Sequence, residues 1–546
     1  MRSDLVVAIK TRQTAQLTRT ERVVAWMLPS LADLLFVCVF FAVFLGLQGK
    51  ALGDDGDAAW SLRIGEQILA HGLPRTEFLL STAYGQPTVH WEWLAQVAYA
   101  LAARLGGLNG VVALAGAIVA ATSAGAFAIT RRRGIPLVPA LALALAAIAL
   151  TSITWTARAQ LFSLPLTLWW SDWIWRYRRD GDTRRLLAFP LVMALWANLH
   201  GGFIAALILL ASATAALWLF PRARGRANPR HLAVTLAATL AATLATPWGL
   251  GLWSHILTYA RNPLISRYTQ EYQSPDFHGA AGLLFLALAF AMIAAWLWCA
   301  RRGAPPDALA VVQVGVWTAL AFVSVRFVPL WALIATPFLG DALTSAWRAR
   351  TPAAQPAVST GGPIAFVMSV AHGALERAAR LSRRLEVTEA RTGRGIWMAL
   401  ALAATLLLLV DGGALPGAST PLADARFDAH AFPIQAAARL HATGLPAGTG
   451  FTTYTWGGYL DYALPEYRPF IDSRSDVYSQ QLLSDYADIV ALRPNWQQLL
   501  ARYGVRWALV PRDDTLTQAL RLAPDWRCAP ADDVGVATLC QRTPPA

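Results

Sequence analysis

Residues 28–60 read LPSLADLLFVCVFFAVFLGLQGKALGDDGDAAW and hold the two features on which the predicted fold depends. The segment 28–48 is apolar almost throughout and is long enough to cross a bilayer, which takes about 20 such residues. Basic residues precede it and no small-residue cleavage site follows it, so we interpret it as an uncleaved first span with a cytoplasmic N-terminus. The segment Gly53–Trp60, GDDGDAAW, then places Asp54, Asp55 and Asp57 directly beyond that span.

The whole chain has the composition of a membrane protein. Hydrophobic residues make up 56% of its 546 residues, charged residues make up 14%, and mean hydropathy is +0.41. Soluble proteins carry about 25% charged residues, so this balance excludes a disordered chain, a coiled coil and an ordinary soluble enzyme. The net charge of +13 would suggest nucleic-acid binding in a soluble protein. Here the arginines cluster between apolar segments, which indicates membrane orientation, and we expect no nucleic-acid partner.

Apolar segments that qualify as spans number eleven. They are 28–48, 110–130, 135–153, 156–175, 186–201, 202–220, 231–249, 280–300, 307–325, 327–345 and 395–413. Arginine clusters follow every second span, at 131–133, 176–185, 222–230, 301–302 and within 346–394. Since basic residues favour the cytoplasmic side, the alternation predicts a mainly α, polytopic membrane protein. Lysine is nearly absent, which is typical of GC-rich bacterial genomes, so we expect a multi-pass protein of the bacterial inner membrane.

Two segments outside these spans need separate interpretation. Residues 91–105 are apolar but end at Gly106 and Gly107, and we expect them to form an interfacial helix in the first external loop, 49–109, rather than a further span. The tail, 414–546, follows the transmembrane part, 1–413, and has the composition of a soluble domain. By the alternation it lies in the periplasm.

The tail predicts a small α/β domain. Strand-like runs alternate with helical patterns, the former at 450–455, 467–472 and 505–511 and the latter at 431–443, 478–491 and 494–503. Cys528 and Cys540 flank an expected hairpin. In an oxidising compartment they either pair or remain two separate thiols.

Polar residues from several predicted spans gather near the external face. They are Asp55, Asp57, His90, Glu92, Arg158, Gln160, Asn198, His200, Glu271, Asp276, His278 and Arg326. Ionisable groups near hydrocarbon cost about 2.5–3.5 kcal/mol each, so they commonly face a cavity or a partner. Singly, Arg158 and Arg326 also fit snorkelling to lipid headgroups, and His200 fits a turn histidine. Together these residues predict a polar chamber open to the outside.

A chamber with acids, imidazoles and arginines suits phosphate and proton chemistry. The planar guanidinium matches phosphate oxygens, a carboxylate can act as general base toward a hydroxyl, and a divalent cation such as Mg or Mn would bridge carboxylate and phosphate. The sequence contains no Walker A motif, dinucleotide-binding fingerprint, zinc-type cluster or G-x-S-x-G motif. A sugar donor on the external side cannot be a cytosolic nucleotide sugar, so a lipid-linked donor is the consistent one.

The acidic motif after the first span, the long first external loop and the α/β tail resemble the GT-C superfamily of polytopic glycosyltransferases. That superfamily uses polyprenyl-phosphate-linked donors and includes the aminoarabinose transferase, protein mannosyltransferases and oligosaccharyltransferases. More closely, the chain is similar to a bacterial branch of GT-C-like membrane proteins. The motifs are Asp57–Gly65, Gly72–Pro74 with Ser81, His90–Leu94, Asn198–Gly201, Trp456–Leu460 and Asp472–Tyr478. Ser61 stands where many members of the branch have a histidine, so no histidine role is carried over there.

The resemblance implies an enzyme that transfers a sugar, with inversion, from the lipid-linked donor to a lipid, glycan or protein acceptor at the periplasmic face. It implies that Asp57 is the base or metal-assisted catalyst, followed by Asp55 and Glu92, and that Asp57 and Glu92 would hold any cation. The implied ligands of the donor phosphate are Arg158, Arg326 and His200. Residues implied to contact or orient the acceptor are His90, Asn198, Glu271, His278, Trp456, Tyr459 and Arg474. Asp472, Arg474 and Asp476 form either an internal salt-bridge cluster or the rim of the acceptor cleft.

Two other functions fit the same composition. A transporter or flippase of a lipid-linked or anionic substrate would be expected to show paired halves with broken helices at the midplane, a symmetry that the sequence does not display. A non-catalytic membrane assembly protein would use the chamber to bind lipid. For that protein, replacing Asp57 would leave function intact.

Overall fold

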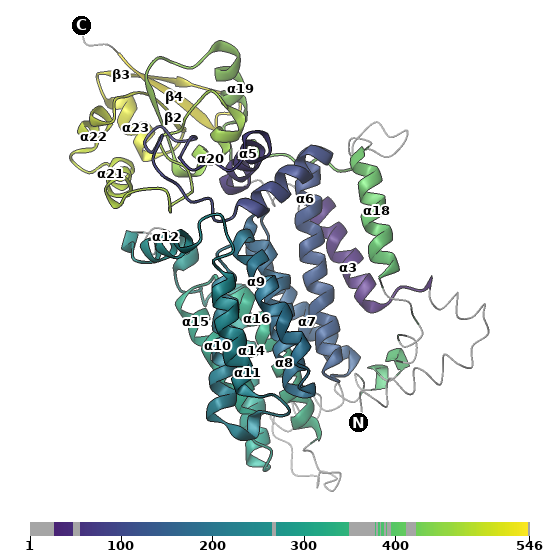
Figure 1. The fold of residues 1–546 in the computed structure, drawn as a ribbon. Coiled ribbons are helices and arrows are strands. Elements are labelled where there is room, and N and C mark those ends of the chain that lie inside the picture. The colour runs from purple at the N-terminus through teal and green to yellow at the C-terminus, as the bar shows by residue number, and fades with distance from the viewer. Residues whose placement is uncertain are drawn as a thin grey trace, which may run out of the picture.

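The structure, a computed structural model, describes residues 27–46, 55–264, 269–348, 377, 380–382, 384–386, 389, 392, 395–410 and 422–543. Long helices pack side by side, and the C-terminal residues form a mixed domain at one end of them (Figure 1). The prediction of a mainly α protein with an α/β tail is therefore confirmed. The predicted boundary at residue 413 falls within residues 411–421, outside the described part, and stays a prediction.

Apolar helices form the bundle. Their bounds are α3 (Leu31–Phe41), α6 (Trp93–Arg132), α7 (Leu137–Thr151), α8 (Ser163–Asp180), α9 (Ala188–Leu199), α10 (Phe203–Leu219), α11 (Pro229–Ala242), α14 (Ala280–Arg301), α15 (Ala308–Val323), α16 (Phe327–Arg348) and α18 (Ile396–Val410). Within the described residues, four segments are long and apolar enough to cross a membrane: Trp93–Arg132, Leu137–Thr154, Ala280–Arg301 and Val325–Trp347. The segments predicted at 156–175 and 231–249 form shorter α-helices than expected, α8 and α11. The count of eleven spans stays a prediction.

A bend in α6 separates the predicted interfacial segment from the span that follows it. The backbone leaves helical geometry at Gly106 (φ −160°, ψ 30°) and at Gly107 (φ 57°, ψ −145°). The positive φ of Gly107 favours glycine, because other residues there would be strained. Figure 1 shows the first part of α6 angled away from the long part. The sequence 91–105 is therefore helical, as expected, and its place at a membrane interface stays a prediction.

Ion pairs tie the arginine-rich turns together at the end of the bundle away from the tail. Arg132 lies 2.8 Å from Asp172 of α8, and Arg133 lies 3.0 Å from Asp341 of α16. Arg178 of α8 pairs with Asp307, which caps α15. Turns that the alternation assigns to one side thus meet in space. The orientation of the bundle in a membrane stays a prediction.

The tail contains a four-stranded sheet of order β1-β2-β4-β3. Its strands are β1 (Thr449–Thr452), β2 (Val505–Pro511), β3 (Trp526–Pro530) and β4 (Ala537–Arg542), and its helices are α19 (Ile434–Thr443), α20 (Tyr454–Ala463), α21 (Gln480–Val490), α22 (Trp496–Arg502) and α23 (Thr515–Leu522). Only β1 and β2 are parallel, and α20, α21 and α22 lie in the connection between them.

The prediction of a strand at 467–472 is wrong, because the structure has no strand there. Its backbone carbonyl groups accept hydrogen bonds from the first loop instead of from a neighbouring strand. Ser81 N–H donates to the Pro469 carbonyl at 3.0 Å, and the Thr82 hydroxyl donates to the Phe470 carbonyl at 2.6 Å. Pro469 also lacks the N–H that a sheet would use.

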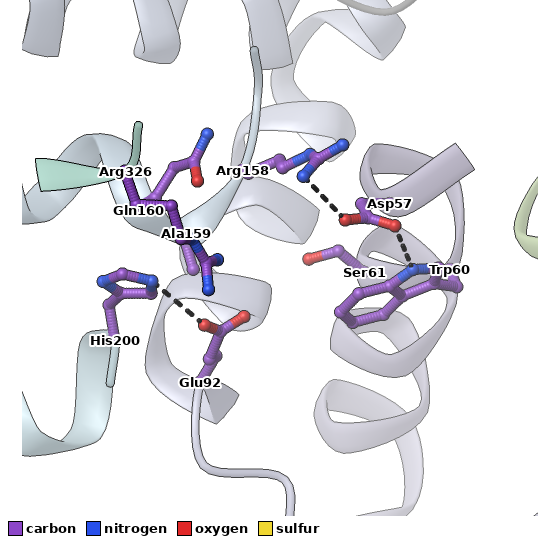
Figure 2. A pocket seen from close by; sticks show the side chains of 9 residues that line it. All are labelled: Asp57, Trp60, Ser61, Glu92, Arg158, Ala159, Gln160, His200 and Arg326. Atoms are coloured by element: carbon purple, nitrogen blue, oxygen red, sulfur yellow. Dashed lines mark hydrogen bonds and ion pairs between the residues drawn. The ribbon is translucent and has the colours of Figure 1, made fainter. Parts of the chain in front are cut away.

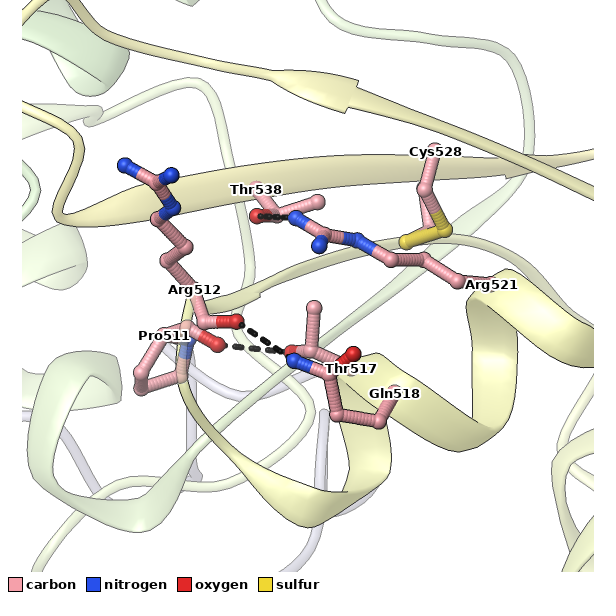
Figure 3. The surroundings of a disulfide bond; sticks show 8 residues. Pro511, Arg512, Thr517, Gln518, Arg521, Cys528 and Thr538 are labelled. Atoms are coloured by element: carbon pink, nitrogen blue, oxygen red, sulfur yellow. Dashed lines mark hydrogen bonds between the residues drawn. A yellow bond between two sulfur atoms is a disulfide. The ribbon is translucent and has the colours of Figure 1, made fainter.

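A disulfide joins β3 and β4. Cys528 and Cys540 are paired across the hairpin, so the structure decides between the two alternatives that the sequence leaves open. Around it, side chains tie α23 to the sheet (Figure 3): Arg521 donates to the Thr538 hydroxyl at 3.3 Å and the Thr517 hydroxyl donates to the Pro511 carbonyl at 2.6 Å. The hairpin is thereby fixed covalently and by polar contacts.

Glycines let the tail approach the first loop. α5 (Gly56–His71) packs against α20, and a Cβ on Gly458 would come within 2.5 Å of the Gly56 carbonyl oxygen. A Cβ on Gly457 would come within 1.9 Å of the Ile471 carbonyl oxygen. The Trp456–Leu460 motif therefore has a packing role that requires glycine at both positions.

A buried ion-pair cluster, Glu77–Arg474–Asp472, completes this junction. Arg474 lies 2.9 Å from Glu77 of the first loop and 2.7 Å from Asp472, and the side chains are 4%, 0% and 0% exposed, respectively. Tyr478 donates to the Asp472 carboxylate at 2.7 Å. Because ion pairs without water depend on every partner, the cluster fixes the tail to the first loop.

Replacing Arg474 should therefore loosen the tail. Arg474→Met leaves two buried carboxylates without their cation, which costs about 3–5 kcal/mol, so Tm of the purified protein should fall by several degrees. Arg527→Met, at an exposed position of β3, is the control of equal charge change. Equal Tm values for the two variants would contradict a stabilising role of the cluster.

Candidate functional site

The N-terminus of α5 presents the two aspartates of the acidic motif. Asp55 is the N-cap, and its carboxylate accepts from the Asp57 backbone N–H at 2.9 Å. An aspartate is favoured there because it satisfies a free N–H and complements the helix dipole. This cap turns Asp57, in the first turn, toward a pocket. Asp54 lies outside the described residues.

Arg158 joins these aspartates to a distant loop. It lies between two short 3₁₀ segments, Ser152–Thr154 and Ala159–Phe162. Its Nε and Nη2 donate to both carboxylate oxygens of Asp55, the second at 2.7 Å. Its Nη1 lies 3.1 Å from Asp57 and 2.8 Å from Glu271. One guanidinium thus holds three acidic side chains, a geometry for which its planar fork is suited.

Glu271 connects Arg158 to Arg326 through ion pairs. Its second carboxylate oxygen lies 3.0 Å from Arg326 Nε, and Arg326 Nη1 donates to the Tyr272 hydroxyl. The Ser324 hydroxyl donates to the Glu271 carbonyl at 2.7 Å. The loop before α14 and the turn between α15 and α16 are therefore fixed to each other at the pocket.

Glu92 and His200 form the opposite wall, with His200 Nε2 3.5 Å from a Glu92 oxygen. His200 Nδ1 accepts from the Gly202 backbone N–H at 3.0 Å and lies 2.8 Å from the Ser163 hydroxyl. Because Nδ1 is an acceptor, a neutral His200 carries its proton on Nε2, toward Glu92.

These side chains line one pocket, a cavity of about 60 Å³. Figure 2 shows Asp57 and Arg158 on one side of it and Glu92, His200 and Arg326 on the other. The remaining lining residues are Trp60, Ser61, Ala159 and Gln160. This volume is below the range of about 300–1,000 Å³ that is usual for small-ligand sites. Six residues of the predicted chamber thus line the pocket, Gln160 among them, and Asp55 and Glu271 bind Arg158 behind it.

Burial sets the protonation of two of the acids. Burial first, and then the charges of Asp476 and Asp57, raise the pKa of Glu92 to about 8, although Arg326 and Arg158 oppose this. Glu92 is therefore mainly neutral at pH 7 and can donate a hydrogen bond. The pKa of Asp55 is also raised, by burial first and by Asp57 second, although Arg158 opposes this.

Other predicted residues lie away from the pocket. Asn198 accepts from Trp93 Nε1 at 2.7 Å and donates to two backbone carbonyls, Trp456 donates to the Ala431 carbonyl, and Tyr459 packs on Phe427. Each of these side chains is used in packing or in hydrogen bonds within the protein, and their acceptor roles stay a prediction.

Three further predicted acceptor residues, His90, His278 and Arg474, also lie away from the pocket, whereas Glu271 contacts its arginines. His278 is fully exposed beside Asp276, and Arg474 belongs to the buried cluster. His90 is buried, and its pKa is lowered to about 4 by burial and by the charge of Arg474. The three tail residues predicted to form one salt-bridge cluster belong to two separate ion pairs. Asp472 pairs with Arg474, whereas Asp476 lies 3.1 Å from His255 of α12 (Leu250–Ala260).

Ser473 is a site residue that the sequence did not indicate. Its hydroxyl donates to Asp57 Oδ1, although 416 positions separate the two in the chain. Trp60 Nε1 lies 3.0 Å from Asp57 Oδ1 and 3.0 Å from the Ser473 hydroxyl. Two sequence signals could have pointed to this contact. The D-x-x-W spacing puts Trp60 one helical turn after Asp57, and Ser473 lies between two charged residues.

The residues present do not fit a resident metal ion. Asp57 and Glu92 both line the pocket, but they lie on opposite sides of it, and Asp57 already accepts from Trp60 and Ser473. In the described part of the chain, no group of three or more His, Cys, Asp or Glu side chains is placed to hold a metal. We therefore derive no step through a cation.

Comparison with solved structures shows the fold. The apo form of the Archaeoglobus fulgidus oligosaccharyltransferase is similar with a TM-score of 0.52 and 11% identity, over 88% of this chain and 69% of that one. ArnT from Cupriavidus metallidurans bound to undecaprenyl phosphate is similar with a TM-score of 0.50 and 16% identity, over 94% and 99%. No family model and no curated protein matches the sequence. The expected GT-C-like fold is confirmed.

The raised pKa of Glu92 predicts a pH-dependent stability. Folded Glu92 keeps its proton up to about pH 8, whereas the unfolded chain releases it near the ordinary value of 4.5. The free energy of unfolding should therefore decrease as pH rises between these values, by about 3 kcal/mol at most from pH 5.5 to 8.5. Glu92→Gln cannot ionise, so its Tm should fall less over that range. Glu66→Gln, an exposed control on α5, should follow the wild type; the same fall in all three proteins would contradict the assignment.

Proposed function

We propose that this protein is a glycosyltransferase that moves a sugar from a polyprenyl-phosphate-linked donor to a lipid, glycan or protein acceptor, with inversion at the anomeric carbon. The observation that carries the proposal is that Asp57 and Arg326, a base and an anion ligand, face one pocket. The fold supports it, because ArnT, which is similar in fold, was solved with undecaprenyl phosphate bound.

Arg326, rather than Arg158, is the better ligand for the donor phosphate. Arg158 uses Nε, Nη1 and Nη2 for Asp55, Asp57 and Glu271. Arg326 uses Nε and Nη1, and its Nη2 makes no hydrogen bond with the residues that the structure describes. A guanidinium with free N–H groups can bind phosphate oxygens without breaking an internal pair. We therefore assign Arg158 to positioning the carboxylates.

The reaction proceeds as a single displacement. An acceptor hydroxyl attacks the anomeric carbon from the face opposite the phosphate, and the bond from that carbon to the phosphate oxygen breaks as the new bond forms. The hydroxyl proton passes to Asp57, which Trp60, Ser473 and Arg158 hold in place. The phosphate departs with its charge delocalised and paired with Arg326, so no general acid is needed. Neutral Glu92 supplies a hydrogen bond to the sugar or the acceptor.

The proposed location is the bacterial inner membrane, with the N-terminus in the cytoplasm and the pocket and tail in the periplasm. Two observations support it. The arginine-rich turns lie at the end of the bundle away from the pocket, as the positive-inside rule requires. The Cys528–Cys540 disulfide suits an oxidising compartment.

Asp57→Asn tests the proposal. Purified wild type and variant are given polyprenyl-phosphate sugars with lipid, glycan and peptide acceptors, with and without EDTA, and products are read by mass spectrometry. The variant should lose transfer by about 10²–10⁴-fold, the usual contribution of a general base. Asp276→Asn, which removes an exposed carboxylate from the loop before α14, should retain activity. Transfer by Asp57→Asn at the wild-type rate would remove Asp57 from catalysis, and no transfer by any protein would favour a transporter or an assembly protein.

The variant Arg326→Gln tests whether Arg326 binds the phosphate of the lipid-linked donor. Loss of a charged hydrogen bond of about 1.5–3 kcal/mol should lower kcat/KM for the lipid-linked donor by roughly 10- to 100-fold. Inhibition by free polyprenyl phosphate should weaken in parallel, because both ligands present the same group. Arg261→Gln, exposed at the end of α12, is the matched control. Unchanged inhibition of Arg326→Gln by polyprenyl phosphate would show that another residue holds the phosphate.

A further inference from the structure

A second pocket lies at the far end of α10 from the candidate site. His200, which lines the first pocket, comes just before α10 begins, and this second pocket lies where α10 ends. The 17 residues of α10 place the two about 25 Å apart. The second pocket is lined by Trp218, Arg224, Ala227, Asn228, Pro229 and Arg230. It belongs to the turn between α10 and α11.

Arginines in this turn lack acidic partners. In the described part of the chain, no carboxylate forms an ion pair with any of Arg222, Arg224, Arg226 and Arg230. By contrast, nearby arginines at the same end, such as Arg132 and Arg133, are paired with aspartates. Within the described residues, the positive charge of this turn is therefore not neutralised, and an anion is the chemical complement.

The turn is held rigidly, so its pocket is formed in advance. The Asn228 backbone N–H donates to the Tyr177 hydroxyl at 3.1 Å, and the Arg226 backbone N–H donates to the Arg178 carbonyl at 2.9 Å. Gly225 has φ 57°, and a Cβ there would lie 2.6 Å from the Arg178 carbonyl oxygen. A site whose backbone is fixed in this way loses little entropy when a ligand binds.

Apolar side chains border the basic turn. Trp218, Leu219 and Phe220, at the end of α10, are 50%, 72% and 44% exposed. Arg224 Nε donates to the Leu217 carbonyl at 2.8 Å, which holds its guanidinium beside these residues. An exposed tryptophan next to cationic groups at the end of an apolar helix is typical of the headgroup level of a membrane.

We propose that this pocket binds the phosphate of an anionic membrane lipid between Arg224 and Arg230. A lipid fits better than free phosphate, because its acyl chains would cover the exposed apolar residues while its headgroup meets the unpaired charge. Basic pockets between membrane helices are known to suit such headgroups. The inference is independent of the proposed function and of the first pocket.

The test compares two double variants of the same turn. Wild type, Arg224→Gln/Arg230→Gln and Arg222→Gln/Arg226→Gln are purified in neutral detergent, and binding of phosphatidylglycerol, phosphatidylcholine or inorganic phosphate is measured by native mass spectrometry. Both doubles lose two positive charges, but only the first removes lining residues. A hydrogen bond from arginine to a phosphate contributes at least about 1 kcal/mol, so the first double should bind phosphatidylglycerol at least about 30-fold more weakly. The second should bind nearly as well as wild type.

Each other outcome would overturn the inference. Equal weakening in both doubles would indicate general attraction to a basic turn instead of a pocket. Binding of inorganic phosphate as strong as that of phosphatidylglycerol would identify a free anion as the ligand. Arg224 also caps α10, and if the first double fails to fold for this structural reason, the single variant Arg230→Gln replaces it. The Arg230 side chain makes no hydrogen bond or ion pair with the described residues, so its loss should not affect folding. That variant should bind phosphatidylglycerol about 5-fold more weakly, and unchanged binding would contradict the site.

Discussion

The guanidinium of Arg158 is the interaction on which the rest of the candidate site depends. It holds both oxygens of Asp55, which caps α5, and so fixes where Asp57 points. It also reaches Glu271, which in turn holds Arg326. Three segments far apart in the chain meet at this one cation. Asp55 and Asp57 are largely removed from water, so both carboxylates depend on the charge of Arg158.

A second constraint comes from the tail. The Glu77–Arg474–Asp472 cluster and the glycines of α20 hold the tail against α5, and Ser473 lies between two members of that cluster. The buried pair Asp472–Arg474 therefore stabilises the fold and also positions the Ser473 hydroxyl to donate to Asp57. Stability and site geometry are set by the same short motif, which explains why its charged residues are buried and do not rim a cleft.

The sequence predicted the parts of the site that have a strong local signal. Asp57, Glu92, Arg158, His200 and Arg326 are ionisable groups beside apolar segments, where such groups are costly, and all five line the pocket. Ser473 was missed because a serine in a soluble tail carries no such signal.

Errors arose where long-range contacts decide the outcome. The run 467–472 has strand-like residues, but its carbonyls bond to Ser81 and Thr82. Trp456 and Tyr459 are packed inside the tail, and their acceptor roles stay a prediction. Periodicity identifies helices and their polar ends, whereas it does not tell which distant backbone will supply a hydrogen bond.

The bond from Ser473 to Asp57 joins residues near opposite ends of the chain, and this sets an order of events during biosynthesis. A chain emerging from the ribosome contains α5 early, when Asp57 still lacks one of its hydrogen-bond donors. The surroundings of Asp57 are complete only after the tail has been synthesised and has folded against α5. A partly synthesised protein therefore holds an incomplete site.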